Sequence, residues 1–127
     1  MSNQAENEVA LSSLPGFSTV EDILKHKSVS GCTMVRRFSL LNSTEEGLFK
    51  CDLILEFVHD HTDSEAARFE FEEVHGLKIS ETHQISGLAI KDIASRGWDR
   101  TRYEIYDYEG DVIQFYCRSI KLSRVPQ

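Results

Sequence analysis

The sequence predicts an α+β fold, in which one short N-terminal helix packs on a six- or seven-stranded, mainly antiparallel sheet that is strongly twisted or curved into a half-barrel. Three observations predict it. Apolar residues recur at helical spacing near the N-terminus, most later segments alternate apolar and polar residues, and no strand–helix–strand alternation is present. The 127 residues suffice for one domain with a modest core.

The helix is predicted at about residues 19–27. It begins with a capping-box pattern at Ser18 and Glu21, and apolar residues then follow at the spacing of one helical face. The preceding residues have no periodicity and end in a Pro-Gly pair. The predicted organisation is a flexible N-terminal segment, 1–17, followed by a single domain, 18–127.

Two strands, 33–41 and 48–59, are predicted to form the first hairpin. The second strand has apolar residues at alternate positions, namely Phe49, Cys51, Leu53, Leu55 and Phe57. A four-residue loop at 43–46 would place Leu40 opposite Phe49. The same register leaves Arg36 opposite Leu53, a misfit that suggests a strand end or a contact with a partner.

Three further strands are predicted at 66–74, 77–80 and 85–93, each next to turn residues. Trp98 follows them and is predicted to close one end of the sheet against the helix. This order of elements contains no internal repeat.

The final hairpin, 103–117, is predicted to turn through Tyr108-Glu109-Gly110, with Gly110 at the position of positive φ. This register places Ile105 opposite Ile113 on an apolar face. The other face carries acidic and tyrosine side chains, so it suits contact with a basic protein better than it suits chemistry.

The chain is acidic, with a net charge of −7 and a pI near 5.2. This charge disfavours direct binding to nucleic acid or to an anionic membrane, and it favours basic partners. No run of apolar residues exceeds three, which predicts neither a transmembrane helix nor a signal peptide. We therefore expect a cytoplasmic location.

The sequence contains no nucleophile elbow, P-loop or HExxH motif, so the chain is predicted not to be an enzyme and to have no catalytic residues and no cofactor. His59, His61 and Asp63 could hold a metal, but their polar surroundings favour a solvated loop without one. The sequence also has three widely spaced cysteines, which we interpret as buried free thiols: Cys32, Cys51 and Cys117.

Acidic residues are concentrated in two stretches. Residues 59–75 carry six acids against one arginine, and residues 104–111 carry four acids and no base. A solvated surface is the ordinary interpretation, and a docking surface for a cationic partner is the functional one. The predicted partner-binding residues are Glu70, Glu72, Tyr106, Asp107, Tyr108, Glu109 and Asp111.

Residues 84–98, which end at Trp98, and the tyrosine-rich hairpin 103–117 resemble small bacterial immunity proteins from polymorphic-toxin loci, including contact-dependent growth inhibition systems. The resemblance implies a protein that binds and neutralises a cognate toxin domain, often a basic nuclease. It does not supply the contact residues, which come from the hairpin register.

Two other functions stay open on the sequence alone. The tyrosine-rich face and an open sheet edge would suit a small homo-oligomeric structural or interaction module, for example a homodimer without a toxin partner. An enzyme or metal-dependent ligand binder built on His59, His61 and Asp63 is the other alternative.

Overall fold

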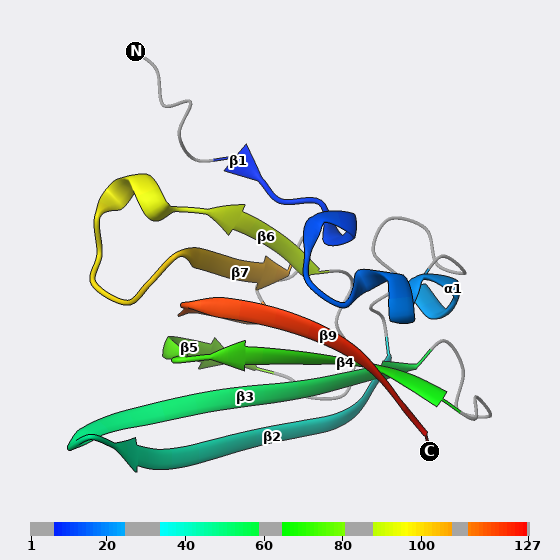
Figure 1. Cartoon of the computed structure of the whole chain (residues 1–127), viewed down its shortest axis with the longest axis horizontal. Helices are drawn as coiled ribbons and strands as arrows, with labels where there is room; N and C mark the ends of the chain where they lie inside the picture. The colour runs from blue at the N-terminus through cyan, green and yellow to red at the C-terminus, as the bar shows by residue number, and fades with distance from the viewer. Residues whose placement is uncertain (1–6, 25–33, 59–64, 81–87, 108–111, 127) are drawn as a thin grey trace.

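Two antiparallel β-sheets make up most of the protein in a computed structural model (Figure 1). The structure describes residues 7–24, 34–58, 65–80, 88–107 and 112–126. The two sheets pack on each other around one apolar core, to which alternate side chains of both sheets contribute.

The first sheet has five strands in the order β1-β6-β7-β8-β5, and each pair of neighbours is antiparallel. Its strands are β1 (Asn7–Glu8), β5 (His75–Ile79), β6 (Leu88–Asp92), β7 (Tyr103–Asp107) and β8 (Ile113–Cys117). We call it the five-stranded sheet.

The second sheet has four strands in the order β2-β3-β4-β9, again with antiparallel neighbours. Its strands are β2 (Met34–Glu45), β3 (Leu48–Val58), β4 (Glu65–Glu72) and β9 (Ser119–Pro126). We call it the four-stranded sheet. Its edge strands are β2 and β9.

The chain crosses between the sheets at two short connections that lie together. Strand β4 leads to β5 through Glu73 and Val74, and β8 leads to β9 through Arg118. The Arg118 N–H donates to the Glu72 carbonyl oxygen at 2.8 Å, and the Arg118 side chain contacts a Glu73 carboxylate oxygen at 2.9 Å. The two sheets are therefore tied together at one corner.

Aromatic residues hold the centre of the core. The ring centroids of Phe71, on β4, and Phe115, on β8, lie 4.9 Å apart with an edge-to-face angle of 83°. Phe69 stacks on Phe71 within β4, and Phe57 on β3 meets Phe69 edge to face. All four side chains are fully buried. Because Phe71 and Phe115 belong to different sheets, their contact joins the two layers.

The predicted α+β class, with one helix on one six- or seven-stranded sheet, is wrong. The described residues contain one four-residue helical turn, α1 (Glu21–Leu24), and three 3-10 turns, η1 (Leu11–Ser13), η2 (Phe17–Thr19) and η3 (Ala94–Arg96). Apolar residues at helical spacing predicted a longer helix, whereas the structure buries Val20 completely at the junction between two short turns, η2 and α1. Alternation of apolar and polar residues marks strands with one buried face, and it does not tell whether they form one sheet or two. Among the residues described, no helix is both long enough and apolar enough to cross a bilayer.

Residues before the helical turn also contact the core. Strand β1 pairs with β6, and Leu14 is buried. The Leu122 N–H donates to the Pro15 carbonyl oxygen at 2.9 Å, and Gly16 follows with a φ of +87°. A Cβ on Gly16 would lie 1.8 Å from the Leu122 carbonyl oxygen, so only glycine fits this approach to β9. The predicted boundary between 1–17 and 18–127 stays a prediction.

The first hairpin has a different register from the predicted one. Glu45 lies opposite Leu48, so Glu46 and Gly47 alone form the turn, with φ values of +53° and +81°. A two-residue turn with positive φ at both positions matches the twist of a hairpin. A β-bulge between Val35 and Arg37 takes up Arg36, which explains the arginine that fitted neither face.

The final hairpin keeps the predicted faces but not the predicted register. Ile105 lies opposite Phe115, and Tyr103 lies opposite Cys117, a shift of two residues. An even shift leaves each side chain on its predicted face, because side chains alternate along a strand. The predicted turn at 108–110 lies outside the described residues.

Candidate functional site

The β2–β3 hairpin extends beyond the rest of its sheet (Figure 1). Pairing of β3 with β4 is in register from Leu53 onward, and the Cys51 carbonyl oxygen accepts a hydrogen bond from the Val74 N–H at 2.7 Å. Closer to the turn, the hairpin continues as a ribbon in which β2 and β3 pair with each other from Ser43 to Lys50. We call residues 40–50 the hairpin end.

The hairpin end carries large apolar side chains in solvent. Phe49 is 91% exposed, the highest value among the exposed large apolar residues of the described chain. The other exposed apolar residues of the hairpin end are Leu40, Leu41 and Leu48. Strand pairing puts Leu40 and Phe49 on the inner face of the ribbon and Leu41 and Leu48 on its outer face, so one short element exposes apolar side chains on both faces. Exposed apolar surface of this kind commonly marks a binding site.

Carboxylates lie on the outer face of the four-stranded sheet beside Leu41 and Leu48, which share that face. The Lys50 Nζ lies 3.7 Å from a Glu45 oxygen and 3.9 Å from oxygens of both Asp52 and Glu72. Glu70 lies two positions before Glu72 on β4 and therefore on the same face. We call Glu45, Asp52, Glu70 and Glu72 the acidic strip. It holds four carboxylates, three of which contact Lys50, whereas Glu70 lies opposite Lys121 of β9.

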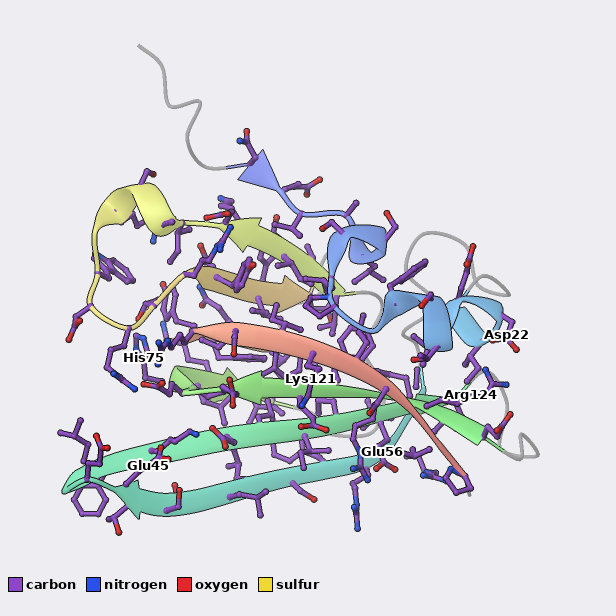
Figure 2. The ribbon with its side chains drawn as sticks, in the orientation of Figure 1. Asp22, Glu45, Glu56, His75, Lys121 and Arg124 are labelled. Carbon is purple, nitrogen blue, oxygen red and sulfur yellow. The ribbon has the colours of Figure 1, made fainter. Side chains whose placement is uncertain are left out.

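The other end of this outer face is basic. Glu56, with a side chain only 3% exposed, accepts hydrogen bonds from Arg36 and from Arg68, the latter at 2.8 and 3.0 Å. Arg37 adds a contact at 3.7 Å. These groups line a shallow pocket of about 430 Å³ together with Val125 and Pro126. Figure 2 shows Glu56 and Glu45 toward opposite ends of the hairpin, so the face is polarised along its length.

The arginines hold Glu56 ionised. Burial alone would raise the pKa of Glu56, but hydrogen bonds and charge from Arg36 and Arg68 outweigh burial and lower this pKa below its ordinary value of 4.5. A carboxylate whose pKa is lower in the folded protein adds stability above its unfolded pKa. That stability is lost as the pH falls through the folded pKa.

Replacing Glu56 with glutamine is therefore expected to lower the free energy of unfolding by about 2 kcal/mol at neutral pH, because charge-assisted hydrogen bonds are lost. The difference from the wild type should shrink as the pH falls below about 4.5. Urea unfolding at several pH values measures it. Glu46→Gln, at the exposed turn, is the control and should change stability by less than about 0.5 kcal/mol. A pH-independent cost of Glu56→Gln would contradict this explanation.

The outer face of the five-stranded sheet carries an aromatic group. The Trp98 and Tyr116 ring centroids are 5.2 Å apart, and His75 stacks on Tyr116 at 5.5 Å. The Arg96 guanidinium lies 5.0 Å from the Trp98 ring centroid. Trp98 is 44% exposed, so the prediction that it closes the sheet against a helix is wrong.

The structure divides the predicted contact residues between the two sheets. Glu70 and Glu72 lie in the acidic strip, on β4. Tyr106 lies on the outer face of the five-stranded sheet, whereas Asp107, next to it on β7, is buried with 4% exposure. The remaining three lie outside the described residues, namely Tyr108, Glu109 and Asp111. Glu70 and Glu72 are therefore not on one face with Tyr106.

The cysteines that the structure describes are free and poorly suited to nucleophilic chemistry. Burial raises the pKa of the Cys117 thiol strongly, and burial followed by the Asp52 charge raises that of Cys51. Cys117 is buried as predicted, and Cys51 is half-buried. Within the described ranges, no group of three histidine, cysteine or acidic residues could hold a metal ion. The predicted candidates at residues 59–63 and Cys32 lie outside those ranges.

Sequence reasoning missed the hairpin end as a surface. Two signals were available: a Glu-Gly pair between two strands, which favours a two-residue turn, and Leu48-Phe49 directly after it. The alternating pattern that continues from Phe49 to Phe57 suggested instead that all of these side chains face a core. The core ends before Phe49 because the five-stranded sheet does not reach that far.

Comparison with known families decides what kind of protein this is. A model of the family of immunity protein PIM8 matches residues 19–123 of the 127. The chain belongs to the PIM8 immunity protein family. The match extends from η2 into β9 and confirms the resemblance to a small immunity protein. Membership implies a cognate toxin as the partner. No curated protein and no solved structure gives a significant match.

Proposed function

We propose that this chain is a cytoplasmic bacterial protein that neutralises a basic, nuclease-type toxin by binding it, without catalysing a reaction. The toxin would come from a polymorphic-toxin or contact-dependent growth inhibition locus. The observation that carries the proposal is the acidic strip beside the exposed apolar hairpin end, in a chain of the PIM8 family with a net charge of −7.

The charge argument follows from what a nuclease must bind. A nuclease cleft contacts phosphates and is therefore basic. Carboxylates held at fixed positions, such as Asp52 and Glu72 around Lys50, can occupy the places of phosphates in such a cleft. Complementary charge also speeds association, which favours capture of a toxin before it reaches its substrate.

The predicted contact residues enter this proposal unequally. Glu70 and Glu72 support it, since both lie on the outer face of β4 and Glu72 contacts Lys50 of the hairpin end at 3.9 Å. Tyr106 would have to meet a separate part of the toxin, because it lies on the other sheet. Asp107 is buried and would contribute to the stability of the sheet more than to binding.

Growth of a bacterial host tests the proposal. The proteins encoded by the two genes that flank this one are each produced from an inducible promoter, with and without this chain. We expect one of them to arrest growth, and this chain to restore it. The arresting protein, once purified, should degrade DNA or RNA, and this chain should stop the degradation.

The salt dependence of the association rate tests the same proposal in a second way. The association rate of the chain with the arresting protein should fall as the salt concentration rises from low to physiological values, because exposed charges are screened. Absence of arrest by either protein, or arrest that this chain does not relieve, would overturn the proposal. Relief of an arrest caused by a protein without nuclease activity would overturn the nuclease part alone.

A further inference from the structure

We propose that the hairpin end is the element that enters the toxin, and that the toxin offers it an apolar pocket bordered by lysine and arginine side chains. This inference rests on the proposed function and adds the location of the contact and the chemistry of the partner surface. It differs from the predicted site on the β7–β8 hairpin.

The first argument is that Phe49 has no role in the core. Its side chain lies on the same face of β3 as Leu53, Leu55 and Phe57, which are fully buried, yet Phe49 is almost fully exposed. An exposed phenylalanine forfeits about 1.5–3 kcal/mol of burial free energy. A partner that covers Phe49 recovers that free energy, and aromatic side chains are common at the centres of interfaces.

The second argument is that the hairpin end has a fixed shape. The turn at Glu46 and Gly47 matches the twist of the strands, and pairing continues in register from Asn42 with Cys51 up to Glu45 with Leu48. The Cys51 carbonyl oxygen anchors the ribbon to Val74, in the corner between the sheets. An element that is ordered before binding loses less conformational entropy when it binds.

The third argument is the charge around the apolar residues. Glu45 and Glu46 lie at the turn, and Asp52 and Glu72 border the ribbon on its outer face. Lys50 is the single basic residue of the hairpin end. Phe49 lies on the inner face, so a partner pocket that receives it would meet the carboxylates of Glu45 and Glu46 at the turn. The part of the partner that covers the outer face would meet Asp52 and Glu72. Basic side chains there would complement them, as expected for a toxin domain that binds nucleic acid.

A second copy of the chain is the competing occupant, because β2 is an edge strand of twelve residues. The structure disfavours pairing along β2. A β-bulge interrupts the strand at Arg36, and both Arg36 and Arg37 lie on this edge strand. Bulges and charged side chains on edge strands are two ways in which proteins block pairing between edges.

The test uses the growth-arresting protein identified by growth rescue and measures its Kd for three variants of the full chain. Phe49→Ala should weaken binding by about 30-fold or more, as expected for a central aromatic residue of an interface. Trp98→Ala is the matched control, since Trp98 is an exposed aromatic residue that lies between η3 and β7 and packs on Tyr116 of the other sheet. It should change Kd by less than about threefold. Glu46→Lys should slow association and weaken its salt dependence.

The outcomes separate this inference from the function on which it rests. Wild-type affinity of Phe49→Ala would overturn the inference and leave the function in place. A wild-type chain that binds no growth-arresting protein would overturn both. Light scattering that shows a dimer of the wild type and a monomer of Phe49→Ala, with unchanged toxin binding, would assign the hairpin end to a second copy and overturn the inference. Unchanged melting of Phe49→Ala would show that the variant is folded.

Discussion

Replacing Phe71 with alanine is expected to lower the free energy of unfolding by about 3–5 kcal/mol, because the change removes a fully buried aromatic ring and leaves a cavity. Phe71 contacts Phe115 across the two sheets and Phe69 within β4, so the cavity would open where the layers meet. Urea unfolding followed by tryptophan fluorescence measures the effect.

Phe49→Ala is the matched control for Phe71→Ala, since both variants remove the same side chain from the four-stranded sheet. Because Phe49 is exposed, Phe49→Ala should lower the free energy of unfolding by less than about 0.5 kcal/mol. A similar loss of stability in both variants would contradict the assignment of Phe71 to the core and of Phe49 to the surface.

Replacing Gly16 with alanine is expected to cost about 3–5 kcal/mol. The positive φ of Gly16 disfavours any Cβ by about 1–2 kcal/mol. The new Cβ would also meet the Leu122 carbonyl oxygen at 1.8 Å, so the chain would have to move away from β9. That movement would break the hydrogen bond from Leu122 to Pro15 and expose part of Leu14. Chemical denaturation measures the loss.

Gly47→Ala separates the two causes. Gly47 has a similar φ of +81°, but a Cβ there would meet nothing within 4 Å. It should therefore show only the conformational cost of about 1–2 kcal/mol. Equal losses for Gly16→Ala and Gly47→Ala would show that the approach of residue 16 to β9 is not close in solution.

The strands and their buried faces were largely predictable, because alternation of apolar residues is a local signal. Leu53, Leu55 and Phe57 point into the core, and Ile105 does so in the final hairpin. Registers were less predictable, because the energy of a hairpin depends on its turn and on what covers its ends. The predicted four-residue loop placed Phe49 opposite Leu40, whereas the structure uses a two-residue turn, pairs Phe49 with Thr44 and leaves Phe49 in solvent.

The division into two sheets was not predictable from local patterns. The chain changes sheets within one or two residues, at Glu73-Val74 and at Arg118. Glu73 adopts a positive φ of +56°, and its carboxylate receives hydrogen bonds from Arg100 and Arg118. The spacing of these residues does not predict that the chain changes sheets there, because the ion pairs join positions far apart in the sequence.

The candidate site was predicted in part. Glu70 and Glu72 are accessible on the outer face of β4, because charged residues that alternate with buried phenylalanines must face away from the core. The same alternation explains why Asp107 is buried. It lies two positions after the buried Ile105 on β7, so its side chain points to the same inner face. The apolar half of the surface, centred on Phe49, depends on where the other sheet ends, which is a tertiary property.

Neutralisation by binding is tested most directly by titrating the purified growth-arresting protein with this chain and measuring its remaining enzymatic activity. The account predicts that activity falls linearly and disappears at one equivalent of the chain, because a tight complex forms before either protein is in excess. Activity that persists in the presence of several equivalents of the folded chain would contradict it.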